Sequence, residues 1–90
     1  MKLETDRMVN ANASAVLQAG EAAIRDGDSS FDLSSVQRCD SAAVAVLLAW
    51  QRTAHACGRP LVLRGIPPSL HSLATLYGVD SLIVGVDLAV

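Results

Sequence analysis

Hydrophobic positions follow a period of about 3.6 residues in three segments of the chain, which predicts three helices. The first begins at Asn12 or Ser14, either of which can cap a helix, and runs to Arg25. The second covers residues 42–57 and the third covers residues 69–77. Each segment is followed within two residues by a glycine, the usual residue just past the end of a helix.

Short apolar runs between these segments predict strands at residues 31–33, 61–63 and 82–86. Residues 1–10 alternate weakly, which is typical of a short hairpin. Strands that alternate with helices favour right-handed βαβ units. We therefore predict one α/β domain over residues 1–90, with a mixed, mainly parallel sheet of four or five strands. We expect the helices mostly on one of its faces, with the second and third helices side by side.

The second helix has an apolar stripe that predicts its buried face. The stripe consists of Ala43, Val46, Leu47, Trp50, Ala54 and Cys57. Trp50 is therefore expected in the core. Val44 and Leu48 lie on the opposite side with the polar residues of this helix, so we expect both to be exposed. An apolar surface of this kind favours contact with another protein.

Composition restricts the classes of function. The chain is 51% hydrophobic with only 3% aromatic residues, so its core must consist mostly of Ala, Val and Leu. Its net charge is −2 and its basic residues are scattered, so no nucleic-acid surface is predicted. The longest apolar run, residues 42–50, is far shorter than the ~20 residues that cross a bilayer. Two cysteines, Cys39 and Cys57, without a secretory leader predict small buried thiols in a reduced, cytoplasmic setting.

Residue patterns for catalysis or metal binding are not found. His55 and His71 have no acidic or cysteine neighbour at ligand spacing, and no phosphate-binding loop or nucleophile elbow occurs. We expect no enzyme activity, cofactor or metal. Asp40-Ser41 remains, and it has two interpretations. It can be a helix cap, or it can present a hydroxyl at the positive end of a helix, where a phosphate or an acidic group is favoured.

Residues 31–48, FDLSSVQRCDSAAVAVLL, resemble the signature of the STAS domains, which are named for sulfate transporters and anti-sigma factor antagonists. That signature is a strand ending in Asp-Leu-Ser, a short loop, and Asp-Ser or Asp-Thr opening an apolar helix. Residues 58–65, GRPLVLRG, and residues 70–79, LHSLATLYGV, extend the match. The last of these is most similar to the MlaB branch, the STAS subunits of Mla-type phospholipid ABC transporters.

The resemblance implies a non-catalytic cytoplasmic subunit that binds the transporter's ATPase subunit and supports its assembly or activity in maintaining outer-membrane lipid asymmetry. It would meet the inner face of the inner membrane only through that complex. Ser41 would take the Ser/Thr position at the ATPase contact. The expected partner-binding residues are Asp40, Ser41, Val44, Leu48 and Leu76.

The alternative that the resemblance implies is an anti-sigma factor antagonist, in which a kinase-type anti-sigma factor phosphorylates Ser41. Exposed apolar residues beside Ser41 favour the transporter subunit, because they suit a constitutive contact better than a switchable one.

Overall fold

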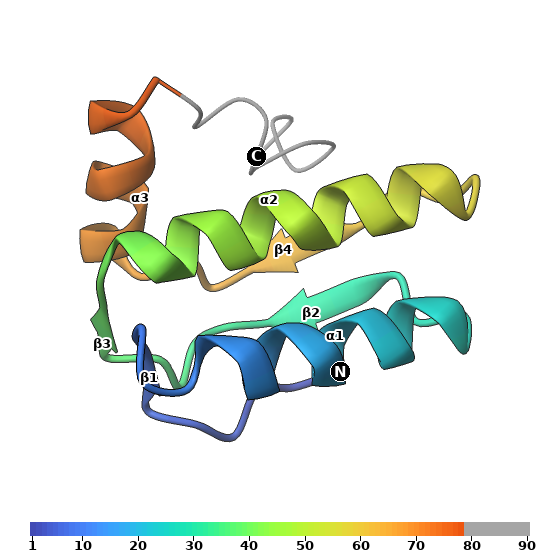
Figure 1. Ribbon diagram of the computed structural model, residues 1–90, viewed down its shortest axis with the longest axis horizontal. Helices are drawn as coiled ribbons and strands as arrows, with labels where there is room; N and C mark the ends of the chain where they lie inside the picture. The colour runs from blue at the N-terminus through green and yellow to red at the C-terminus, as the bar shows by residue number, and fades with distance from the viewer. Residues whose placement is uncertain (79–90) are drawn as a thin grey trace.

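The computed structural model describes residues 1–78, which form three helices and four short strands (Figure 1). The strands are β1 (Arg7–Met8), β2 (Ser30–Asp32), β3 (Arg38–Cys39) and β4 (Val62–Arg64). The helices are α1 (Ala13–Arg25), α2 (Ser41–Ala56) and α3 (Pro68–Leu76). The prediction of a small α/β fold with parallel strands is confirmed. The strand expected at residues 82–86 lies outside the described residues.

The strands form two parallel pairs, β2 with β4 and β1 with β3, rather than one sheet. The turn after β2 explains the division. Its backbone bends where the Ser34 N–H donates to Asp32 Oδ1 and the Val36 N–H donates to the Leu33 carbonyl. The chain therefore leaves the β2–β4 pair before it reaches β3.

The N-terminal hairpin expected within residues 1–10 is wrong, because both halves of this segment pair with later parts of the chain. Lys2 forms a parallel bridge to Asp32 at the edge of β2. Arg7 lies opposite Arg38 in the β1–β3 pair. A weak alternation of apolar residues fixes which side of a strand is buried, but it does not fix the partner strand.

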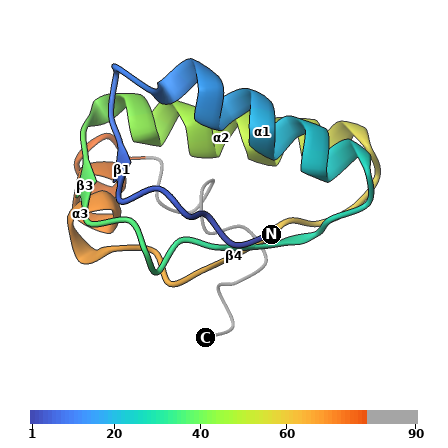
Figure 2. The same cartoon turned by 90° about the horizontal axis from the view of Figure 1, so that it is seen from below.

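Helices α1 and α2 lie side by side over the β2–β4 strands, whereas α3 stands across the end of α2 beside β3 (Figures 1 and 2). The expectation that α2 and α3 lie side by side on the sheet is therefore wrong. Neighbouring strands are about 4.8 Å apart and packed helices about 8–10 Å apart. A two-stranded pair is therefore too narrow to carry three helices side by side, and α1 occupies the place beside α2.

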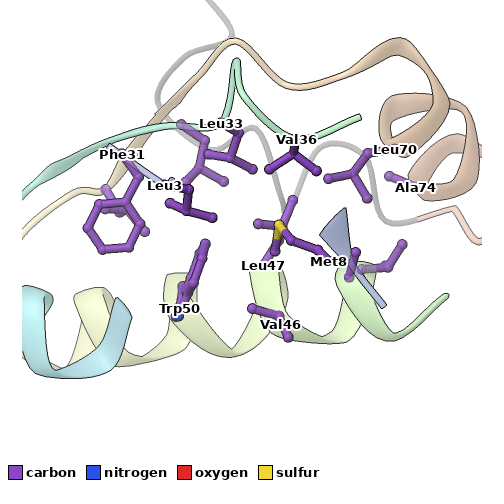
Figure 3. Packing of buried hydrophobic residues seen from close by; sticks show 14 of the residues in the cluster. Leu3, Met8, Phe31, Leu33, Val36, Val46, Leu47, Trp50, Leu70 and Ala74 are labelled. Atoms are coloured by element: carbon purple, nitrogen blue, oxygen red, sulfur yellow. The ribbon is translucent and has the colours of Figure 1, made fainter. Parts of the chain in front are cut away.

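Trp50 fills the centre of the core, as predicted, with none of its side chain exposed (Figure 3). Its ring meets that of Phe31 edge to face at 5.0 Å between centroids. The indole N–H donates to the Leu17 carbonyl at 3.1 Å, which satisfies the one polar atom of the ring. Gly20 of α1 lies directly against the indole. The tryptophan thus joins both helices to the strands beneath them.

Candidate docking site at the start of helix α2

Asp40 fixes the start of α2 and ties it to the loop after β1. It has extended backbone angles, and its Oδ1 accepts a hydrogen bond from the Ala42 N–H at 2.9 Å. This is the N-cap geometry that the sequence predicts. Its second oxygen, Oδ2, accepts from the Asn10 N–H at 3.0 Å. One carboxylate therefore holds two loops together.

The loop after β1 is braced by Asn12, whose side chain turns back toward the strand. Asn12 Oδ1 accepts from the Val9 N–H and Nδ2 donates to the Arg7 carbonyl, both at 3.0 Å. Asn12 thus occupies the cap position of α1 but makes no side-chain cap bond there. Because β1 and β3 are parallel, their carboxyl ends lead into α1 and α2 at the same edge. Asn10 and Ser41 are therefore brought to one side of the molecule.

Ser41 is the first residue of α2 and its side chain is exposed. Within residues 1–78 its hydroxyl has no hydrogen-bond partner. The neighbouring carboxylate of Asp40 already accepts from two backbone N–H groups, so it is not placed as a base that would activate the hydroxyl. The positive end of the helix dipole favours an anion or an acceptor atom at this position. The arrangement suits recognition or modification of a hydroxyl rather than nucleophilic catalysis.

Val44 belongs to the core, so the expectation that it is exposed is wrong. Only 4% of the residue is accessible. The expectation assumed one buried face, whereas α2 contacts α1 on one side and α3 near its N-terminal end, besides covering the strands. A helix with several neighbours buries more of its circumference than a helix lying alone on a sheet.

The other two apolar candidates differ in exposure. Leu48 is half-buried and packs against the core from the outer side of α2. Leu76 is the last residue of α3 and is 77% exposed. The spacing of Leu70, Leu73, Ala74 and Tyr77 predicts a buried stripe on α3, but Tyr77 is also exposed. The structure therefore brings Asp40 and Ser41 together, sets Leu48 two turns further along α2, and leaves Leu76 on a different helix.

The outer side of α2 also forms a groove that the sequence interpretation missed. We call it the α2 groove; its volume is about 550 Å³, and its lining within residues 1–78 consists of Leu48, Gln51, Arg52 and His55. The Gln51 amide donates to the Leu61 carbonyl at 3.2 Å, which fixes this wall. The spacing of the lining residues, i, i+3, i+4 and i+7, was the available signal. This spacing places the residues on one face of a helix, but it does not distinguish an exposed face from a buried stripe.

Neither the thiols nor the imidazoles form a reactive group in the part of the chain described. Cys39 and Cys57 are free and half-buried, and Cys39 Sγ lies 3.3 Å from Ser69 Oγ. His55 and His71 are exposed. No group of three or more His, Cys, Asp or Glu side chains within residues 1–78 is placed to hold a metal ion. No helix in these residues is long and apolar enough to cross a membrane.

A small α/β fold in which an Asp-Leu-Ser strand leads to a capped apolar helix with an exposed serine has the features of a STAS domain. The family model described as the MlaB STAS domain matches residues 5–85, which is most of the chain. The chain therefore belongs to the MlaB-type STAS family. None of the curated proteins matches the chain significantly.

Proposed function

We propose that the chain is the STAS subunit of an Mla-type phospholipid ABC transporter and binds the transporter's ATPase subunit through the start of α2. In this proposal it is a non-catalytic cytoplasmic subunit that reaches the inner face of the inner membrane only through the complex. It supports assembly or activity of the ATPase in maintaining outer-membrane lipid asymmetry. The observation that carries the proposal is the match of residues 5–85 to the MlaB STAS family.

The surface around Ser41 supports a docking role on chemical grounds. Asp40 fixes the backbone around Ser41 through its bonds with the Ala42 and Asn10 N–H groups, so little backbone freedom is lost there when a partner binds. Leu48 and Leu76 supply the apolar contacts in our proposal, one along α2 and one on α3. Val44 contributes from the core instead, by keeping the first turns of α2 in position.

A second candidate is an anti-sigma factor antagonist controlled by phosphorylation of Ser41. It is favoured by one observation, the exposed hydroxyl at the start of α2, which has no partner among the described residues. A phosphate added there would lie near the positive end of the helix dipole. In this case the partner would be a kinase-type anti-sigma factor.

The experiment is co-purification of the chain with the ATPase subunit of the transporter, using Ser41→Asp and Ser41→Arg. Asp caps a helix start and suits the dipole, so we expect the thermal melt of Ser41→Asp to stay close to that of the unmodified chain. The same charge in a desolvated contact would weaken binding by several kcal/mol. Arg25→Glu is the control, because Arg25 is exposed in the last turn of the other helix, α1, away from Ser41.

Loss of the complex with both Ser41 variants, with an unchanged melt and a normal Arg25→Glu complex, would support docking at Ser41. If both variants still bind, the surface is wrong although the partner is right. If the unmodified chain does not bind the ATPase at all, the transporter proposal fails. Phosphorylation of Ser41 by a kinase-type anti-sigma factor that also binds the chain would establish the second candidate instead.

A further inference from the structure

The exposed side of α2 continues without interruption from the proposed docking residue to the far end of the helix. Its members recur every three or four residues and so share one face. They are Ser41, Ala45, Leu48, Arg52 and His55. At 1.5 Å per residue this face is roughly 21 Å long. The α2 groove forms its second half, so a partner bound at Ser41 and extending along α2 would reach it.

The groove combines an apolar floor with basic groups at its rim. Leu48 is half-buried beneath it, whereas Arg52 and His55 are exposed. Arg52 has no ion-pair or hydrogen-bond partner within residues 1–78. Helix α2 contains no Asp or Glu, although the whole chain has a net charge of −2. An uncompensated arginine beside an apolar floor is complementary to a carboxylate carried on an apolar segment.

We infer that the α2 groove binds an acidic, amphipathic segment of the ATPase subunit, with an apolar side chain against Leu48 and a carboxylate on Arg52. This inference rests on the proposed function and extends its contact surface. The groove is open along an exposed helix face, which suits a polypeptide segment better than an enclosed small ligand. Because the groove is continuous with Ser41, where we propose that the ATPase subunit binds, we favour a segment of that subunit over an anionic lipid as the occupant.

A purely structural role for Arg52 would be to complement the negative end of the α2 dipole. Arg25 provides the matched control for this role. It is also an exposed arginine, it lies in the last turn of α1, and it has no ion-pair partner among the described residues. Arg25 ends α1, whereas Arg52 lies one turn before the end of α2, so charge reversal at Arg25 would disturb a helix dipole at least as much; only Arg52 lines the groove.

The test measures the affinity of the purified ATPase subunit for the full chain and for Arg52→Glu, Arg52→Gln and Arg25→Glu. We expect binding about tenfold weaker for Arg52→Glu, a smaller loss for Arg52→Gln, and no change for Arg25→Glu. Raising the salt concentration should weaken the unmodified complex more than the Arg52→Gln complex. Equal affinities of the Arg52 and Arg25 variants would overturn the inference. If Ser41→Arg abolishes binding in the same assay, the proposed function stands nonetheless.

Cross-linking identifies the occupant. With benzoylphenylalanine in place of His55, irradiation of the complex should attach a segment of the ATPase subunit that contains both apolar and acidic residues. Attachment to a segment without Asp or Glu, or to residues 79–90 of this chain, would overturn the inference. So would binding of the free chain to phosphatidylglycerol vesicles that is lost in Arg52→Glu and kept in Arg25→Glu, because the groove would then be a lipid site.

Discussion

Gly20 is the position where helix propensity and packing predict opposite results. It is an interior position of α1, a kind of site that normally gains stability from alanine. Replacing glycine by alanine in an unobstructed helix stabilises it by about 1 kcal/mol. At Gly20, however, an added Cβ would overlap Cε2 and Nε1 of the Trp50 indole. We therefore predict that Gly20→Ala destabilises the protein.

The magnitude depends on whether the indole can move. The Trp50 N–H donates to the Leu17 carbonyl and the ring packs edge to face on Phe31, so a shift of the ring would disturb both contacts. The overlap must then be relieved largely by moving α1 away from α2. Overpacking of a core typically costs about 1–3 kcal/mol, and the overlap with two indole atoms calls for the upper part of that range, about 2–3 kcal/mol, from which the gain in propensity is subtracted. We expect a net loss of about 1–2 kcal/mol, which lowers Tm by about 4–16 °C in a domain of this size.

The assay is urea and thermal unfolding followed by far-UV circular dichroism, in the unmodified chain and in a Trp50→Phe background. Phenylalanine has no pyrrole ring, so Gly20→Ala should cost at least about 1 kcal/mol less there. Ala19→Gly, at the exposed preceding position, measures the propensity effect alone. A higher Tm for Gly20→Ala, or the same change in both backgrounds, would refute the packing argument.

Two further predictions concern Asp40 and Asp32. Asp40→Ala removes the cap of α2 and the acceptor for Asn10, so it should lower the free energy of unfolding by about 1–2 kcal/mol in urea. Asp40→Asn retains one acceptor oxygen and should lose less; equal stability of all three proteins would contradict the bracing role. Hydrogen bonds from the Ser34 side chain and backbone N–H lower the pKa of Asp32 below its ordinary 3.8. The stability that this provides is fully present above the unfolded-state pKa of about 3.9 and is lost as pH falls through the lower folded-state value. An NMR titration of Asp32 should therefore give a midpoint below 3.8 in the unmodified chain and a higher midpoint in a variant that lacks the hydrogen bond from the Ser34 side chain. A midpoint at 3.8 or above in the unmodified chain would contradict this assignment.

The sequence by itself determined the three helices, strands β2 and β4, and the residue at the centre of the core. The period of apolar residues predicts all three helices to within two residues at each end, because an amphipathic helix repeats its buried face within one continuous segment. It also predicts burial of Trp50 and the capping role of Asp40, which depend on neighbours in the same helix. The resemblance of residues 31–48 to STAS domains indicates the family that the match over residues 5–85 shows.

Only the tertiary structure decided how these elements are combined. The strands pair as β1–β3 and β2–β4 because of a turn between β2 and β3, and strand partners 31 or 32 residues apart leave no local pattern. Val44 is buried because α2 has several neighbours at once, which a count around one helix does not reveal. The second hydrogen bond of Asp40, to Asn10, depends on two parallel strands ending at the same edge. Periodicity predicts which face of a segment is buried, and only the folded chain shows which other segments cover that face.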